Sequence, residues 1–278
     1  MKQTVLITGT SSGFGAAAAR YFAEKGWNVI ATMRDAGKAG DLGHMSNVFI
    51  TKLDVHVAET IDAAIAAGIE RFGRIDVIVN NAGYGLFGIF EGVSREAIQQ
   101  QFDVNVFGAM DVTRAILPHF RANHAGTIIN ISSGAGAIGF PMASIYSASK
   151  FALEGFSEGL RYELASLGIK VKVIEPGGAL KTGFQARVGG ESGNMQLIED
   201  YFPFLNRISA LYGGMQDAAD EDAVEKVVAT IFEAAVDESD RLRYMPTNDI
   251  QPILDARRGT SEQDYHAFTN SLFVPKEH

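Results

Sequence analysis

The stretch VLITGTSSGFG, residues 5–15, decides the fold class. Its first part, Val5–Thr8, is a compact apolar run of the kind found in strands buried on both faces. Glycines follow at positions 9, 13 and 15, and a helical pattern over Phe14–Lys25 begins directly behind them. Such a turn lets the backbone approach a pyrophosphate, and the helix N-terminus offers free N–H groups and the positive end of a dipole. The spacing is GxxxGxG rather than the common GxGxxG, so a purely structural turn stays an alternative here.

The rest of the chain repeats this alternation of strand and helix. Further Val- and Ile-rich strands are expected at Asn28–Ala31, Val48–Lys52, Asp76–Asn80, Thr127–Ile131 and Lys170–Ile174. Helices are expected at Ala58–Phe72, Arg95–Phe107, Val112–Arg121 and Ser149–Leu167. Alternation of this kind predicts an α/β fold, with a single Rossmann-type doubly wound parallel sheet and helices on both faces.

One domain is expected over residues 1–278, because no linker or repeat interrupts the pattern. The alternation loosens after Thr182, so we expect a variable insertion at about 183–219. A helix near 221–235 and a short strand near 242–245 follow, and an irregular C-terminal tail is expected from about 246.

Composition excludes several classes of function. The chain carries 24 Lys and Arg against 33 Asp and Glu, a net charge of −9, which disfavours nucleic acid or an anionic membrane as a partner. It has no cysteine, and its six histidines show no metal-ligand spacing, so neither a disulfide nor a metal site is expected. No apolar run approaches 18 residues, so we expect no membrane span. The apolar run at residues 5–7 stops at Thr8-Gly9 and is too short for a secretory signal, so we expect a cytoplasmic location.

Tyr146 and Lys150 form a YxxxK pattern that places both side chains on one face of a helix. An isolated phenol has a pKa near 10 and is a poor acid or base at neutral pH, but an adjacent ammonium stabilises the phenolate and lowers that pKa. YxxxK alone is a frequent accident and often a surface pair. Ser133, just beyond the expected strand at 127–131, and the glycine turn argue against an accident here.

Two asparagine motifs remain open when taken alone. Asn80-Asn81-Ala82-Gly83 follows the fourth expected strand and can be a simple polar turn. Asn105 is a polar residue in an apolar helical stretch, and a surface or helix-bending asparagine is its ordinary interpretation.

Taken together, these motifs make the chain similar to the short-chain dehydrogenase/reductases. The matching elements are TGxxxGxG at 8–15, Asp54, NNAG at 80–83, Asn105, Ser133, YxxxK at 146–150, Pro176-Gly177 and Thr182. The resemblance is close over residues 1–185, and residues 8–15, 31–35 and 175–177 resemble the 17β-hydroxysteroid and retinol dehydrogenase-like branch. Thr182 departs from that branch, because it stands six residues past Pro176 where five are usual.

The resemblance implies an enzyme that interconverts a carbonyl and an alcohol with a nicotinamide cofactor. Tyr146 would exchange the proton, Ser133 would hold the substrate oxygen, and Asn105 would anchor a water that links Lys150 to solvent. Lys150 would lower the pKa of Tyr146 and hold the nicotinamide ribose. The expected cofactor contacts are Gly9, Ser11, Ser12, Gly13, Phe14, Gly15, Arg34, Asp54, Val55, Asn81, Ala82, Gly83, Tyr146, Lys150, Pro176, Gly177 and Thr182.

The end of the second strand favours NADP(H) over NAD(H). The family places an acidic residue there to bind the ribose 2′-hydroxyl of NAD, and Met33 stands at that position. Arg34 beside it can pair with a 2′-phosphate. Asp35 is the competing candidate, but it lies beyond the expected strand end.

Apolar residues are frequent over 184–215, which matches the segment that covers the substrate in this family. We therefore expect a lid over a bulky apolar substrate, with Phe140 and Phe184 joining Ser133 and Tyr146 as substrate contacts, although short helices packed on the core give the same spacing. The family also implies a homodimer or homotetramer. A non-catalytic NADP(H)-sensing regulatory protein is the alternative function, and the intact set of Ser133, Tyr146 and Lys150 argues against it.

Overall fold

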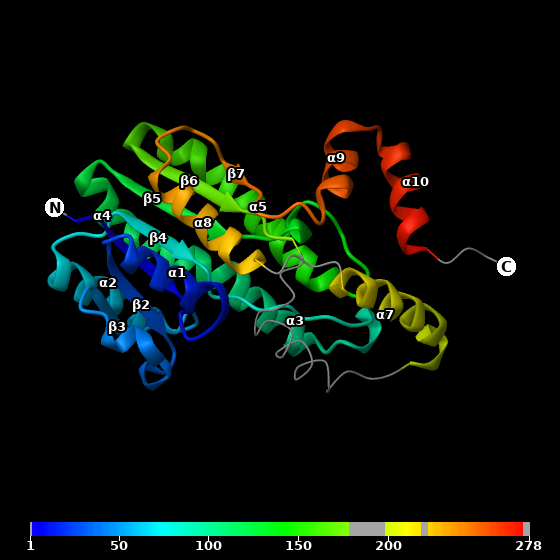
Figure 1. Ribbon diagram of the computed structural model, residues 1–278, viewed down its shortest axis with the longest axis horizontal. Helices are drawn as coiled ribbons and strands as arrows, with labels where there is room; N and C mark the ends of the chain where they lie inside the picture. Colours follow the sequence, from blue (N-terminus) through cyan, green and yellow to red (C-terminus); the bar gives the residue numbers. More distant parts are fainter. Residues whose placement is uncertain (1, 178–197, 218–221, 275–278) are drawn as a thin grey trace.

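The structure, a computed structural model, describes residues 2–177, 198–217 and 222–274. These residues form one parallel sheet of seven strands in the order β3-β2-β1-β4-β5-β6-β7 (Figure 1). The strands are β1 (Thr4–Thr8), β2 (Asn28–Met33), β3 (Val48–Lys52), β4 (Val77–Asn80), β5 (Gly126–Ile131), β6 (Ile169–Ile174) and β7 (Arg243–Tyr244). The order reverses between β1 and β4, so the doubly wound sheet expected from the alternation is confirmed.

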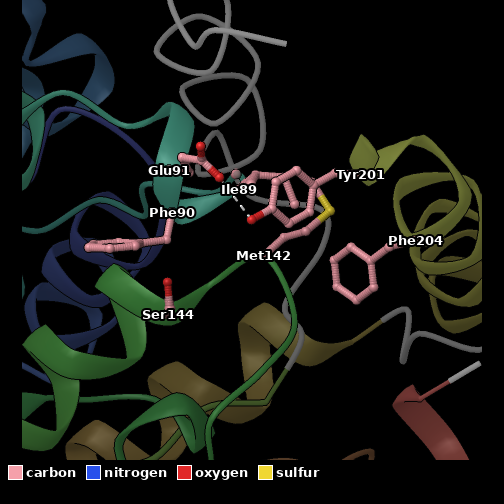
Figure 2. Close-up of a pocket in the computed structure, with 8 residues that line it drawn as sticks. Ile89, Phe90, Glu91, Met142, Ser144, Tyr201 and Phe204 are labelled. Atoms are coloured by element: carbon pink, nitrogen blue, oxygen red, sulfur yellow. Dashed lines mark hydrogen bonds between the residues drawn. The ribbon is translucent and has the colours of Figure 1, made fainter. Parts of the chain in front are cut away.

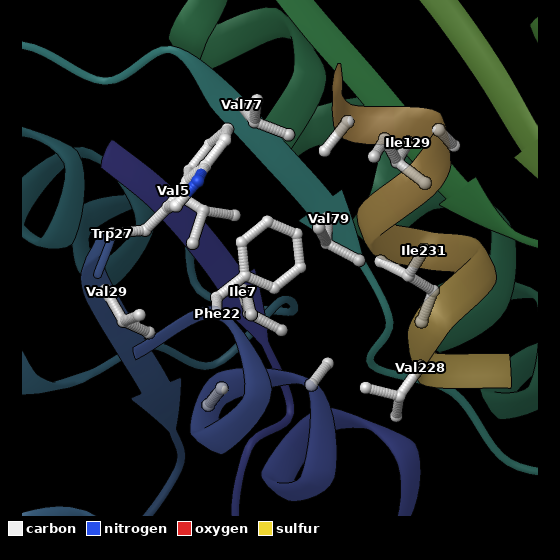
Figure 3. Packing of buried hydrophobic residues seen from close by; sticks show 14 of the residues in the cluster. Val5, Ile7, Phe22, Trp27, Val29, Val77, Val79, Ile129, Val228 and Ile231 are labelled. Carbon is white, nitrogen blue, oxygen red and sulfur yellow. The ribbon is translucent and has the colours of Figure 1, made fainter. Parts of the chain in front are cut away.

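Helices cover both faces of the sheet because successive strand residues point to opposite sides. On one face, Val5 and Ile7 pack against α1 (Gly13–Glu24) and α8 (Ala223–Val236), where Phe22 and Ile231 fill the centre (Figure 3). On the other face, Leu6 belongs to a cluster with residues of α2 (Ala58–Phe72), α4 (Ala109–Asn123) and α5 (Ser144–Leu164). Strand β1 is buried along its whole length, as expected for a central parallel strand.

Two of the expected helices have different boundaries in the structure. The helix expected at Arg95–Phe107 is α3 (Arg95–Phe102), followed by a π-helical turn over Asp103–Gly108 that runs on into α4. Helix α5 begins at Ser144 rather than at 149, so Tyr146 lies in its first turn.

The C-terminal residues, expected to be irregular, form two helices. These are α9 (Gln251–Gly259) and α10 (Glu262–Phe273), which lie at the opposite end of the molecule from the N-terminus (Figure 1). They form because Ile253, Leu254 and Tyr265 share an apolar cluster with Ile138, and because the Ser261 side chain caps α10 by accepting from Asp264 N–H.

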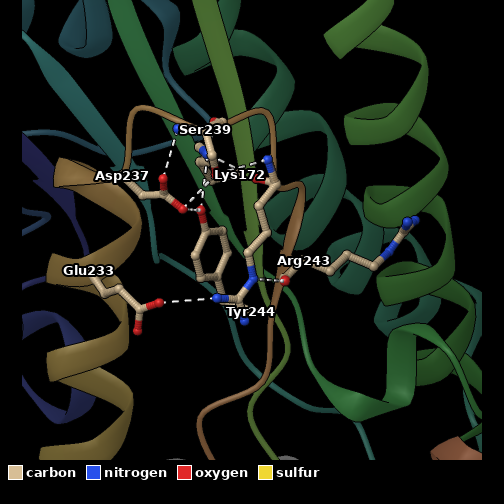
Figure 4. A network of polar contacts seen from close by, with 7 residues as sticks. Lys172, Glu233, Asp237, Ser239, Arg243 and Tyr244 are labelled. Atoms are coloured by element: carbon tan, nitrogen blue, oxygen red, sulfur yellow. Dashed lines mark hydrogen bonds and ion pairs between the residues drawn. The ribbon is translucent and has the colours of Figure 1, made fainter.

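A buried lysine fixes the short strand β7 beside β6. Lys172 is fully buried, and its Nζ donates to the carbonyl oxygens of Ser239 and Arg241 and to Tyr244 Oη (Figure 4). The Tyr244 hydroxyl donates in turn to Asp237 Oδ2 at 2.6 Å. All three ammonium hydrogens of Lys172 are thereby used, which is what allows a charged side chain to be buried here.

Candidate active site

The turn between β1 and α1 leaves no room for a side chain at Gly15. A Cβ at Gly15 would lie 2.3 Å from the carbonyl oxygen of Gly9 and 2.5 Å from Asn81 Nδ2. Gly9 and Gly13 have φ angles of 73° and 58°, a region that favours glycine. The predicted turn is thus a bare backbone cradle in front of the α1 N-terminus, whose first turn carries no acidic residue. This arrangement fits the pyrophosphate of a dinucleotide.

Asn81 and Thr8 tie the glycine turn to the end of β4. Asn81 Nδ2 donates to the carbonyl oxygens of Thr8 (2.9 Å) and Gly9 (3.2 Å). Thr8 Oγ1 accepts from the backbone N–H groups of Asn81 and Ala82, each at 3.0 Å. Asn81 was predicted as a cofactor contact, whereas the organising role of Thr8 was missed, although it opens the quoted TGxxxGxG motif.

The end of β2 presents one cationic side chain. Met33 is buried, with 2% of its surface exposed, and Asp35 Oδ1 accepts from Gly37 N–H at 3.0 Å to cap the next turn. Arg34 is exposed, and no ion pair joins it to any other described residue. Of these three side chains, only Arg34 lies on the surface without a described partner.

Two further predicted cofactor contacts, Asp54 and Val55, follow β3 and also contact other residues of the protein. Asp54 Oδ1 accepts from His56 N–H at 3.1 Å. Val55 is buried and packs against Gly108, at which an added Cβ would lie 2.7 Å from Val55 Cβ.

Ser133, Tyr146 and Lys150 come together at the carboxyl end of β5. The Ser133 hydroxyl hydrogen-bonds the Tyr146 phenol, and Lys150 Nζ donates to the carbonyl oxygen of Ile131 at 2.8 Å. Lys150 Nζ lies 5.7 Å from the centre of the Tyr146 ring. Because Ser133 directly follows the strand and the other two share one helix face, the predicted set forms one polar group of side chains.

Burial determines the pKa values of this group. It raises the pKa of Tyr146 to about 12, more than the Ser133 hydrogen bond lowers it. Burial also lowers the pKa of Lys150 to about 8, against the opposing charge of Glu154. Burial therefore sets the direction of the phenol shift in this structure, and the lowering expected from Lys150 stays a prediction. At neutral pH both groups carry their protons, and Tyr146 is in the form that donates one.

Asn105 lies in the π-helical turn, behind the polar group. Its Oδ1 accepts from Tyr84 N–H at 3.0 Å, and its Nδ2 donates to the Tyr84 carbonyl oxygen (2.9 Å) and to Ser149 Oγ (3.2 Å). Ser149 Oγ donates to the carbonyl oxygen of Tyr146 at 2.7 Å. Asn105 thus connects the segment after β4 to the first turn of α5. Its expected role as a water anchor stays a prediction.

An apolar cavity of about 440 Å³ lies at the N-terminal end of α5, where Ser144 lines it (Figure 2). It is lined by Gly88, Ile89, Phe90, Glu91, Met142, Ser144, Tyr201 and Phe204. The last two residues belong to the segment that runs into α7 (Phe202–Asp217), and the Tyr201 hydroxyl donates to Glu91 Oε2 at 3.0 Å.

Two aromatic side chains, Phe87 and Phe140, pack beside the Tyr146 phenol, and Phe87 directly precedes Gly88 of the cavity lining. The Phe87 ring stacks on Tyr146 with centroids 5.6 Å apart, and Phe140 packs in the same cluster. Phe140 also contacts Phe273 of α10 edge-on. Two further predicted contacts, Thr182 for the cofactor and Phe184 for the substrate, lie outside the described residues.

The segment after β7 packs directly on the catalytic loops, which the sequence did not indicate. A Cβ at Gly134 would lie 1.8 Å from Ile250 Cδ1, and Gly177 N–H donates to Thr247 Oγ1 at 3.0 Å. Pro176 accepts from Gly134 N–H at 2.8 Å through its carbonyl oxygen, so the two predicted loops are joined. The apolar spacing of Ile250, Ile253 and Leu254 is the signal that could have predicted this contact.

Within the described ranges, no three His, Asp or Glu side chains are grouped to hold a metal ion. No helix of the described chain is both long and apolar enough to cross a membrane.

Residues 3–192 match the family model described as short chain dehydrogenase. The chain belongs to the short-chain dehydrogenase/reductase family. It is 40% identical over 224 residues to an uncharacterised oxidoreductase of Schizosaccharomyces pombe, covering 78% of this chain and 89% of that protein. It is 33% identical to mouse 17-beta-hydroxysteroid dehydrogenase type 1, over 96% of this chain and 80% of that protein.

Solved structures agree with this assignment. A short-chain dehydrogenase from Streptomyces avermitilis superposes with a TM-score of 0.80 at 32% identity, covering 98% of this chain and 96% of that one. Two further solved relatives hold NADH in one case and NADP in the other. The resemblance inferred from the motifs is therefore confirmed, and the family uses nicotinamide cofactors.

Proposed function

We propose that this chain is an NADP(H)-dependent oxidoreductase that interconverts a ketone or aldehyde with its alcohol. The observation that supports this most is the hydrogen-bonded pair of Ser133 and Tyr146, with Lys150 one helical turn away at the end of β5. A hydroxyl, a protonated phenol and a buried ammonium are the groups that a carbonyl oxygen needs as it gains a proton.

In the proposed reduction each residue has one task. Ser133 donates a hydrogen bond to the carbonyl oxygen and orients it, and the Tyr146 hydroxyl transfers its proton to the same oxygen. The Lys150 ammonium stabilises the phenolate that remains, and Asn105 holds the first turn of α5 in place through Ser149. The nicotinamide, when bound, supplies the hydride to the carbonyl carbon. The oxidation of an alcohol uses the same groups in reverse.

The proposed cofactor preference depends on Arg34. A guanidinium pairs with a ribose 2′-phosphate by charge-assisted hydrogen bonds, and Met33 and Asp35 are turned to other contacts. Loss of such a pair corresponds to about a 10- to 100-fold fall in kcat/KM for NADPH. Arg34→Ala should cause that fall and leave NADH nearly unchanged. Arg20→Ala is the matched control, because Arg20 of α1 is paired with Asp41 at the surface. A wild-type enzyme that prefers NADH would contradict the proposal.

The proposed substrate is a bulky apolar carbonyl compound. The cavity next to Ser144 is lined largely by apolar side chains, and we propose that residues 183–219 form the lid over it. Tyr212 of α7 supports that role, because its hydroxyl donates to the carbonyl oxygen of Pro141 at 2.7 Å, beside the cavity wall. Burial of apolar surface contributes about 25 cal/mol per Å², so kcat/KM should rise from acetone to aryl and polycyclic ketones. A flat series would contradict the substrate class.

We also propose a cytoplasmic homodimer or homotetramer that folds as a single domain. Three exposed aromatic side chains on the helices support self-association, namely Phe107, Phe151 and Tyr162, with exposed fractions of 49%, 43% and 68%. The absence of cysteine fits a reducing compartment. Sedimentation equilibrium of the purified chain tests the assembly, and a monomer at micromolar concentration would contradict it.

A further inference from the structure

A buried carboxyl group behind Lys150 has no task in the proposed reaction. Glu154 lies four residues after Lys150 in α5, so the two side chains share one helix face. Only 6% of Glu154 is exposed. Its Oε2 accepts from Arg243 Nε of β7 at 3.0 Å, and the buried Ser132 hydroxyl interacts with the same carboxyl group.

The segment that carries Ser133 leaves space for this carboxyl group. A Cβ at Gly136 would lie 2.6 Å from Ser132 Oγ, 2.8 Å from Glu154 Cγ and 3.2 Å from Glu154 Oε1. Glu154 therefore reaches beneath the turn over Gly134–Gly136, which directly follows Ser133. Burying a carboxylate costs stability even when it is paired, so the position of Glu154 on the helix face that carries Tyr146 and Lys150 calls for a function.

The titratable and charged groups near Lys150 and Glu154 come from three parts of the fold. On α5 itself, Tyr146 and Glu154 lie one turn before and one turn after it, and Glu154 is the group whose charge opposes the effect of burial on the Lys150 pKa. Directly after β6, Glu175 is fully buried and pairs with Arg258 of α9, at 2.8 and 3.0 Å. From β7, Arg243 lies between Glu154, Glu158 and Glu175.

We propose that Glu154 is a positioning residue that keeps Lys150 cationic, with Arg243 holding the carboxylate in place. The inference rests on the proposed function for the role of Lys150. A fully buried lysine without a counter-charge can have a pKa of about 5–6 and would be neutral at pH 7. Burial and, to a smaller extent, the charge of Glu175 raise the pKa of Glu154, whereas the Ser132 hydroxyl and the Arg243 guanidinium lower it. The ionised Glu154 held by Arg243 is the form that lets Lys150 keep its proton through neutral pH and stabilise the Tyr146 phenolate.

The test compares Glu154→Gln with Glu158→Gln. Glu158 binds the same guanidinium, at Arg243 Nη2, but its side chain is 48% exposed and it lies two helical turns after Lys150. The activity that requires cationic Lys150 is lost as pH rises through the Lys150 pKa. Glu154→Gln should therefore move the alkaline limb of the kcat/KM profile down by about one pH unit, whereas Glu158→Gln should leave it in place. Glu154→Asp keeps the charge, so the alkaline limb of its kcat/KM profile should lie close to that of the wild type.

A second readout does not depend on turnover. Lysine labelled with ¹³C at Cε reports the titration of Lys150 by NMR, with Lys150→Met assigning the signal. The wild-type midpoint should lie near 8, and Glu154→Gln should lower it by the same unit as the kinetic limb. A wild-type midpoint below about 6, or equal midpoints in Glu154→Gln and wild type, would overturn the proposal even if Glu154→Gln proves too unstable for kinetics. If no ketone is turned over, the proposed function fails while this titration still decides the role of Glu154.

Discussion

Tyr146 and Lys150 are both removed from water, and burial acts on their pKa values in opposite directions. The phenol pKa rises to about 12 and the ammonium pKa falls to about 8. The residue types and their spacing could be predicted from the sequence. The direction of the phenol shift could not, because it depends on how Phe87 and Phe140 exclude water from the ring.

These pKa values predict the pH dependence of carbonyl reduction. Tyr146 remains protonated throughout the accessible range, so it does not limit the rate on the alkaline side. Lys150 loses its charge as pH rises through about 8, so kcat/KM for reduction should be level near neutrality and fall above that value. The measurement is kcat/KM for one ketone at constant ionic strength across pH 6–10. A rate that keeps rising up to pH 10 would show that the Lys150 charge is not needed.

At the scale of elements, the turn between β1 and α1 was predictable because glycine spacing is visible in the sequence. Its attachment to β4 was not, because the hydrogen bonds of Asn81 and Thr8 join residues more than seventy positions apart. The π-helical turn at Asp103–Gly108 was also missed, since a local sequence pattern does not distinguish it from α-helix.

Gly15→Ala tests whether this turn holds the cofactor. The new methyl group would meet the Gly9 carbonyl oxygen at 2.3 Å, and backbone must move to admit it. We expect NADPH affinity to fall at least about tenfold, which is 1.4 kcal/mol, as measured by calorimetry. Gly159→Ala in α5 is the control, since no atom lies within 4 Å of its added Cβ. It should leave affinity unchanged and raise stability by about 0.5–1 kcal/mol. Equal affinities in Gly15→Ala and wild type would exclude the turn as the binding site.

For the whole molecule, the C-terminal helices are part of the catalytic end rather than an irregular tail. Arg258 of α9 binds both oxygens of Glu175, the fully buried residue that precedes Pro176-Gly177. The sequence predicted the sheet and its order of elements because their patterns are local. It did not predict this docking, since an isolated helix of nine residues is not stable by itself and forms here only through its contacts.

The neighbouring arginines of α9 provide a test of that docking. Arg258→Met should lower the free energy of unfolding by about 1–2 kcal/mol, because among the described residues it leaves the buried Glu175 with Arg243, at 3.6 Å, as its ion-pair partner. Arg257→Met should cost less than about 1 kcal/mol, since its partner Glu262 is 65% exposed. Urea unfolding of the two variants and wild type gives these differences. A larger loss in Arg257→Met would show that the pair with Glu175 does not hold α9.

The central claim is that Tyr146 donates the proton in an NADPH-dependent carbonyl reduction, and one measurement tests it most directly. The oxidation of NADPH is followed by absorbance with a bulky aryl ketone, for wild type and for Tyr146→Phe, after calorimetry has shown that both bind NADPH. Removing a general acid costs about 10²–10⁴-fold, so kcat should fall by at least a hundredfold while NADPH affinity persists. A Tyr146→Phe enzyme that retains a tenth of the wild-type rate would contradict the account.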